Sequence, residues 1–308
     1  MARLEILEND IGIMQRGETY LLDVKFREEN SSVAVTSASM EITYPCDSGS
    51  TSTSLTTTPT TGRYEGVWNI PSSATYGEYR VKITATYESK TFIFENQFFI
   101  LPWNITQQIR SVSGIKQSND IDDRDIAIIA WNAYLEAKEK CFLRILDEEL
   151  KIDGNHYIDG SNKTFYTRNT NLVSDHLVCD ESAIEGLYKT DDYEIYELTT
   201  SITDAKTGKI SVADKDGNAL TSSVGCRVLL NYRIKSPAFK EQLFKKAVVY
   251  LASHEVILRF NELDKATLAD LDSNKPVILA NPDRMLKQYK KTMKKISMKR
   301  VGGVSYEP

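Results

Sequence analysis

The sequence of 308 residues lacks any run of about 18 apolar residues, the length that a membrane-spanning helix needs. Its first residues, MARLEILENDIG, carry acids where a secretory signal peptide has an apolar stretch. Both absences favour a chain that is neither inserted in a membrane nor exported. With 41% hydrophobic and 26% charged residues, the composition is that of a globular protein and not of a disordered or fibrous one.

Cysteine and histidine are also scarce. Four cysteines are scattered along the chain, at Cys46, Cys141, Cys179 and Cys226. They form no CxxC pair, which favours reduced and mostly buried thiols over a disulfide framework or a zinc cage. Only three histidines are present, and His254-Glu255 is followed by Leu258 where a zinc-protease motif needs its second histidine. We expect no metal site.

Catalytic motifs are missing as well. There is no GxxxxGK[ST], GxGxxG or GxSxG segment, so neither a phosphate-binding loop nor a nucleophile elbow has a candidate. The segment from Asp214 to Asn218 resembles the opening of a calcium loop, but Ala219 and Gly225 replace the required glycine and glutamate. A hairpin turn is favoured there. We expect no enzyme and no cofactor, although motif searches leave open a site assembled from distant residues.

The N-terminal part has the alternating pattern of short antiparallel strands. Five are predicted, at Tyr20–Arg27, Ser37–Thr43, Gly62–Trp68, Gly77–Tyr87 and Thr91–Ile100. The segment SGSTSTSLTTTPTTG between them is too polar for a core and is expected as an exposed loop. The run RYEGVWNIPSSATYGEYRVKITATY resembles the later strands of immunoglobulin-like domains, without their disulfide. We therefore expect an immunoglobulin-like β-sandwich over residues 1–102.

A linker is expected at Leu101–Trp103, where Pro102 removes a backbone donor and the alternation stops. Acids then precede a helix predicted over Asp122–Leu146. This helix is apolar over most of its girth, so it needs partners on two sides, either within a bundle or at a subunit interface. Its candidate packing residues are Ile126, Ile129, Trp131, Tyr134 and Phe142.

Turn pairs and alternating residues return in a β-rich insert of this second domain, at about residues 153–235. Ser236-Pro237 then opens a helix predicted to run to Asn261, with Phe239, Leu243 and Leu251 on its apolar side. The fold class expected from these patterns is α+β and multidomain: a sandwich over residues 1–102, a helical domain with its β-rich insert over 103–280, and a basic tail over 281–308.

The basic charge is concentrated in this tail. Residues 284–300 contain eight basic residues and no acid, so the rest of the chain carries a net charge of −13 against a total of −5. As an amphipathic helix, the segment is a solvated face, a surface for an acidic protein, or a contact for nucleic acid. No aromatic residues lie among its lysines, which favours the protein. The predicted docking residues are Arg284, Leu286, Lys287, Tyr289, Lys290, Lys291, Met293, Lys294 and Lys295.

The second domain resembles the head–tail adaptor, or connector, proteins of tailed viruses. The helix entry SGIKQSNDIDDRDIAIIAWNAYLEAKEKCF, the strand end VLLNYRIKSP and the helix FKEQLFKKAVVYLASHEV carry this resemblance. In that family a strand ending in an aromatic residue is followed by a proline and a helix of this type. The matching positions are Tyr232, Pro237, Lys246, Ala247, Leu251, Ala252 and His254.

This resemblance implies a structural virion protein at the head–tail junction, assembled in the host cytoplasm. Such proteins form rings, commonly of twelve identical subunits, that lie between the portal protein and a tail-side neck or tail protein. DNA passes through the channel without specific contacts, and no membrane is involved. The N-terminal sandwich and the β-rich insert depart from compact members of the family. The alternative is a surface-binding module for carbohydrate or a cell-surface protein, for which the Ser/Thr-rich segment and Trp68 are the cues.

Overall fold

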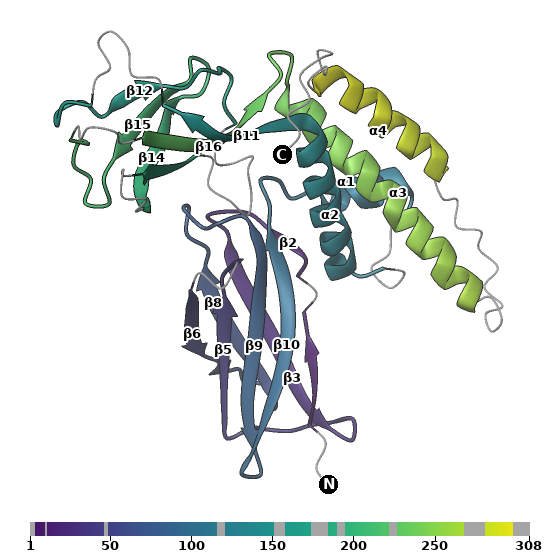
Figure 1. Cartoon of the computed structure of the whole chain (residues 1–308). Helices are drawn as coiled ribbons and strands as arrows, with labels where there is room; N and C mark the ends of the chain where they lie inside the picture. Colours follow the sequence, from purple (N-terminus) through teal and green to yellow (C-terminus); the bar gives the residue numbers. More distant parts are fainter. Residues whose placement is uncertain are drawn as a thin grey trace. The chain divides into compact units, whose positions relative to one another are not determined.

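The computed structural model describes residues 4–9, 11–45, 49–115, 121–150, 158–173, 184–189, 195–221, 227–267 and 281–297. Within these ranges the chain is mixed and mostly β, with three sheets and four helices (Figure 1). The chain divides into two compact units, one of residues 1–134 and 248–288, the other of residues 135–247 and 289–308. The three-part division expected from the sequence stays a prediction.

Two five-stranded sheets lie in the first unit. One has the order β1-β3-β8-β7, with β4 beside β3, and consists of β1 (Leu4–Glu8), β3 (Thr19–Glu28), β4 (Ser31–Ser32), β7 (Thr56–Thr57) and β8 (Arg63–Asn69). The other has the order β2-β10-β9-β5-β6 and consists of β2 (Ile13–Met14), β5 (Ser37–Thr43), β6 (Ser50–Ser54), β9 (Gly77–Tyr87) and β10 (Lys90–Ile100). All pairs are antiparallel except β2 with β10.

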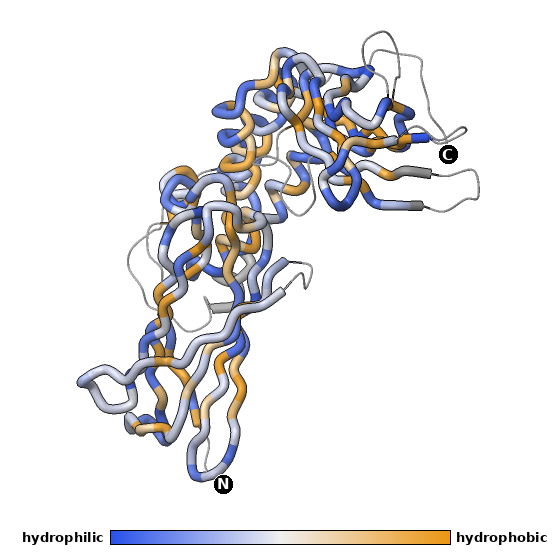
Figure 2. Tube along the Cα trace, turned by 90° about the vertical axis from the view of Figure 1, so that its left-hand side faces the viewer, coloured by the Kyte–Doolittle hydropathy of each residue, from blue (hydrophilic) through white to orange (hydrophobic). Residues whose placement is uncertain are grey.

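Aromatic side chains join the two sheets into a sandwich. Tyr20 of β3 stacks on Phe98 of β10 with ring centroids 4.4 Å apart, and Trp68 of β8 lies 5.6 Å from Tyr79 of β9. The five predicted strands are confirmed as β3, β5, β8, β9 and β10. Their alternation of buried and exposed residues, visible along the tube in Figure 2, places one face of each strand in this core.

The Ser/Thr-rich segment is not the loop that we expected, because it forms β6 and β7. Strand β6 pairs with β5 in the register Met40 with Thr53 and Ile42 with Thr51. Four of its five residues are exposed. The strand forms because threonine suits β structure and because a strand at the edge of a sheet does not need apolar residues.

Helices α1 (Thr106–Ser113) and α2 (Asp123–Cys141) follow the sandwich. Asp122 Oδ1 accepts the backbone N–H of Asp125 at 2.7 Å, which confirms the acidic cap predicted at the start of α2. Arg110 of α1 forms an ion pair with Asp123 at 2.6 Å. Gly12 faces the same turn, where an added Cβ would lie only 2.0 Å from the carbonyl oxygen of Asp123. The first half of α2 therefore packs closely on the sandwich.

The segment Leu101–Trp103 is tied to the sandwich and is not a loose linker. The N–H of Leu101 donates to the carbonyl oxygen of Met14, and Gln15 Nε2 donates to the carbonyl oxygen of Pro102 at 3.3 Å. Leu101 is 1% exposed. Alternation stops at Pro102 because proline cannot donate to a sheet, but the neighbouring backbone remains hydrogen-bonded.

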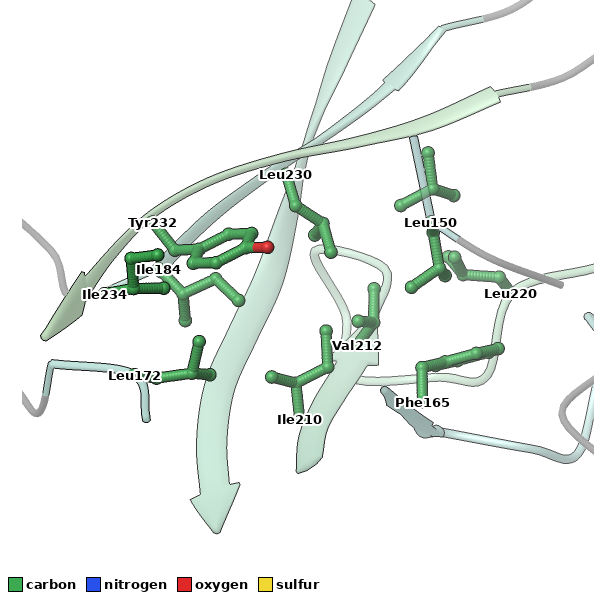
Figure 3. Close-up of a cluster of buried hydrophobic side chains, with 11 residues drawn as sticks. Leu150, Phe165, Leu172, Ile184, Ile210, Val212, Leu220, Leu230, Tyr232 and Ile234 are labelled. Carbon is green, nitrogen blue, oxygen red and sulfur yellow. The ribbon is translucent and has the colours of Figure 1, made fainter. Parts of the chain in front are cut away.

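A six-stranded antiparallel sheet forms most of the second unit, in the order β11-β16-β13-β14-β15-β12. Its strands are β11 (Phe142–Glu149), β12 (Thr164–Tyr166), β13 (Ile184–Lys189), β14 (Ile195–Asp204), β15 (Lys209–Ala213) and β16 (Arg227–Lys235). Figure 3 shows apolar side chains from these strands and their loops, among them Phe165, Ile210 and Leu230, meeting in one buried cluster. The β-rich insert is thus a sheet with its own core.

One predicted helix ends earlier than expected. We predicted helix from Asp122 to Leu146, but α2 ends at Cys141 and the next eight residues form β11. Leu143 and Ile145 alternate with Arg144, and the strand pairs with β16. Pairing with a distant strand outweighs the helical periodicity here. The remaining helices are α3 (Glu241–Thr267) and α4 (Pro282–Ile296).

Candidate functional site

Helix α4 has two chemically different faces. One face is apolar and buried, with Met285, Tyr289, Met293 and Ile296 each no more than 7% exposed. The other carries six basic side chains, all of them exposed: Arg284, Lys287, Lys290, Lys291, Lys294 and Lys295. Asp283 in the first turn is the single acid of the helix. The sequence-predicted helix is therefore confirmed, and its polar face forms a basic surface, which we call the α4 lysine face.

The end of α2 holds the second half of α4 in place. Tyr289 Oη lies 3.5 Å from Glu136 Oε1, and the Cys141 Sγ–H donates to the carbonyl oxygen of Ile296 at 3.7 Å. Lys140 lies over the ring of Tyr289, 5.6 Å from its centroid. Burial, with the neighbouring Glu136 carboxylate, raises the pKa of Tyr289 above its usual range. These contacts fix the direction in which the lysines project.

Two of the predicted apolar anchors are used inside the chain. We expected Leu286, Tyr289 and Met293 to contact a partner, but Tyr289 is 3% and Met293 6% exposed, and Leu286 is half-buried. An amphipathic helix buries its apolar stripe on whatever surface is nearest, and here that surface belongs to the same chain. A partner would therefore meet the six basic residues and not these anchors.

The α4 lysine face has unspent charge. Among the described residues, none of its six basic side chains forms an ion pair. Lys294 and Lys295 lie in the last turn, where cations interact favourably with the helix dipole. The charges spread over about 16 Å, from residue 284 to residue 295 at 1.5 Å per residue. A surface of this kind attracts acidic proteins or phosphates.

The residues that we predicted to pack between ring subunits lie mostly inside the chain. Ile126, Tyr134 and Phe142 are no more than 4% exposed, and Leu251 is 3% exposed. Ile129 is 9% exposed, while Trp131, Phe239 and Leu243 are half-buried.

Partners from the same chain cover both stripes of α2. In the first unit Trp131 lies 6.0 Å from Phe99 and stacks on Tyr134. In the second unit Phe142 lies 5.4 Å from both Phe239 and Phe244. The two apolar stripes thus have partners without a neighbouring subunit, which corrects the argument from unsatisfied flanks to a subunit interface.

Strand β11 is a feature that sequence analysis missed. It lies at one end of the six-stranded sheet and pairs, among the described strands, only with β16. Leu143 and Leu146 are 50% and 57% exposed. The register shifts between Ile145 and Glu148, which marks a β-bulge. The run of alternating residues after Cys141 was the available signal.

A buried polar network lies behind this strand. Glu148 accepts hydrogen bonds from the hydroxyl of Tyr232, the side-chain amide of Asn169 and the backbone N–H of Arg168, at 2.5, 3.1 and 2.8 Å. Burial first, and then the bond to Glu148, raises the pKa of Tyr232 above its usual range. Each side chain has a partner, so the network ties β11, β16 and the segment after β12 together and exposes no reactive group.

The remaining candidate chemistry is structural in the described part of the chain. Asp214 accepts the backbone N–H groups of Asp216 and Asn218, and its own N–H donates to the carbonyl oxygen of Asn218, so the suspected calcium loop is a turn as predicted. Burial raises the pKa of the Cys141 thiol to about 12. The other three cysteines lie outside the described residues.

Two further searches of the described residues were negative. No group of three or more histidine, cysteine, aspartate or glutamate side chains there has the arrangement of a metal site. No helix there has the length and apolar character needed to cross a membrane.

The cues for a carbohydrate-binding surface have other roles in the structure. Trp68 is half-buried, and its ring lies 6.1 Å from Tyr44 and 6.2 Å from Phe98 in the sandwich core. The Ser/Thr-rich segment forms β6 and β7. Neither feature offers the exposed aromatic platform that the carbohydrate reading needs.

Comparisons with known proteins give no family. No family description and no curated protein matches the chain. Among solved structures it is similar to a CARDB domain from Pyrococcus furiosus, at 13% identity and a TM-score of 0.21, covering 32% of this chain and 89% of that domain. It is also similar to Salmonella alpha-2-macroglobulin, at 9% identity and a TM-score of 0.28, over 76% of this chain.

A third similar structure is a family 123 glycoside hydrolase from Clostridium perfringens, at 12% identity and a TM-score of 0.21, over 44% of this chain. The chain spans 14% of the macroglobulin and 36% of the hydrolase. TM-scores of this size carry no argument about fold or function.

Proposed function

We propose that the chain is a non-enzymatic structural protein of a virion, a head–tail adaptor that joins the portal protein to a tail-side protein. It binds other proteins and carries out no bond-making step. The observation that carries the proposal is the α4 lysine face, which presents six exposed basic side chains on a helix whose other face is buried. The sequence resemblance to connector proteins supplies the identity of the partner.

The α4 lysine face docks onto an acidic surface of the portal. Because Tyr289 and the end of α2 fix the helix, the lysines are ordered before the partner arrives, so docking costs little conformational entropy. Charges at such a contact raise the association rate and fix the register, and salt screens them. The apolar stripe of α4 stays with its own chain, unlike in the docking mode expected from the sequence.

The adaptor forms a ring of identical subunits, commonly twelve in the proteins it resembles, and DNA passes through the ring without specific contacts. Contacts between ring neighbours use surfaces other than the buried stripes of α2 and α3. The sandwich is immunoglobulin-like and lies outside the ring as decoration or as a contact for the tail. The six-stranded sheet is an elaboration of the helical adaptor domain.

Charge reversal tests the proposal. In the variant K290E/K291E/K294E/K295E, binding of the full chain to purified portal rings of the same virus should weaken by about 100-fold or more, because four exposed pairs at about 0.2–1 kcal/mol each become repulsions. The matched control is K90E/K206E/K215E/K240E, which reverses four exposed lysines elsewhere. It should bind as the original chain does. Equal binding by both variants contradicts docking through α4.

A further inference from the structure

Strand β11 ends the six-stranded sheet with an uncovered apolar edge. Its only strand partner in the described chain is β16, on one side. Leu146 is 57% exposed, the largest value among the exposed apolar side chains of the described residues, and Leu143 is 50% exposed. A strand edge with exposed leucines is a template for pairing with another strand, because its backbone donors and acceptors on that side lack a ladder.

The charges of β11 are arranged antisymmetrically about its middle. Arg144 lies before Ile145 and Leu146, and Asp147 lies after them. Arg144 and Asp147 are both exposed, and neither forms an ion pair with a described residue. The bulge holds the acid in position, since Asp147 has a φ of 50° and its N–H donates to Asn231 Oδ1 at 2.9 Å. The strand thus offers one free positive and one free negative charge.

We infer that β11 is a self-association edge, at which a second copy of this chain pairs through its own β11 in antiparallel orientation. A two-fold axis between Ile145 and Leu146 places Arg144 of each copy opposite Asp147 of the other. Directly opposite residues in an antiparallel pair have Cβ atoms about 4.5–5.5 Å apart, close enough for both ion pairs to form. Ile145 then lies opposite Leu146, so the exposed leucine is covered.

The charge pattern selects a second copy over other occupants. A parallel pairing in register would place Arg144 against Arg144 and Asp147 against Asp147, which is repulsive, whereas the antiparallel pairing converts both repulsions into attractions. The contact is isologous, since the same patch serves both copies. It therefore closes a pair and does not extend into a fibre. The inference does not depend on the α4 lysine face or on the proposed adaptor function.

Charge exchange tests the inference. Sedimentation velocity of the full chain over a concentration series should show a monomer–dimer equilibrium, with a dissociation constant in the micromolar range because the contact is small. R144E and D147R should each raise this constant by about tenfold or more, because each replaces two attractive pairs by two repulsive ones. The double variant R144E/D147R restores opposite charges and should return the constant to within about threefold of the original.

Two more variants keep the test independent of folding. L146K should abolish the dimer, and V67K, at a 54% exposed position on the sandwich, should leave it unchanged. Circular dichroism checks that all variants fold. A chain that stays monomeric, or a double variant as weak as the single ones, overturns the inference. A larger assembly of the same size in every variant also overturns it, and that result leaves the proposed function standing.

Discussion

Replacement of Gly12 by alanine tests how closely α2 packs on the sandwich. The new Cβ would lie 2.0 Å from the carbonyl oxygen of Asp123 and 3.0 Å from the Cβ of Ala127. Neither side can move freely, because Gly12 accepts a hydrogen bond from the N–H of Phe99 at 2.8 Å and the Asp123 oxygen belongs to helix backbone. Forcing extra atoms into a close-packed site costs about 1–3 kcal/mol, and backbone contacts give the upper part of that range.

G12A should therefore lower the free energy of unfolding by about 2–3 kcal/mol and the melting temperature by about 4–12 °C. The matched control is G17A, where no atom lies within 4 Å but φ is +80°. Its cost is backbone strain alone, about 1 kcal/mol. Calorimetry of the full chain compares the two variants. A G12A protein as stable as G17A, or more stable, refutes the packing that we describe.

Three further predictions concern buried polar groups. E148Q should cost about 1–3 kcal/mol in urea unfolding, because the bonds to Tyr232 lose their charged acceptor, and Y232F should cost less because the carboxylate keeps its other donors. Burial raises the pKa of Tyr79 from 10.0 to about 12, so the stability gained from its protonated form is present below pH 10 and is lost as pH rises toward 12; Y79F should flatten the stability profile in that window, as measured by denaturation at each pH. The Cys141 thiol, with its pKa raised to about 12, should resist maleimide in the folded chain and react only in denaturant, as read from its own peptide by mass spectrometry.

Local signals in the sequence predicted much of the fold. Strand β9 is the clearest case, because Val81, Ile83 and Ala85 alternate with polar residues and all three are buried. The cap at Asp122 and the turn at Asp214 were also predictable, since each uses a carboxylate to bind backbone N–H groups within four residues. These features depend on neighbours in the chain, which the sequence shows directly.

Long-range pairing was not predictable in the same way. Helix α2 gives way to β11 because Leu143 pairs with Ile234, a residue 91 positions later, and no local pattern identifies such a partner. Helix α1 was missed because it has eight residues and no side-chain hydrogen bond at its N-cap. The stripes of α2 predicted that two surfaces must cover them but not that Phe99 belongs to one of them.

The candidate site divides along the same line. Exposure of the α4 lysines follows from the charge pattern and is confirmed, because six cations on one helix face cannot be buried without partners. The role given to Tyr289 and Met293 depended on which surface the apolar stripe meets. That surface lies in the same chain, and in the second unit Glu136 and Cys141 contact the stripe.

The central claim, that the α4 lysine face binds an acidic protein partner, is tested most directly by zero-length carbodiimide cross-linking of assembled particles that contain this chain. The account predicts cross-links from Lys290, Lys291, Lys294 or Lys295 to aspartate or glutamate residues of the portal protein. Their loss at high salt would agree with screened charges at the contact. Particles in which these lysines link only to acids of their own chain, while the portal links elsewhere on the protein, would contradict the account.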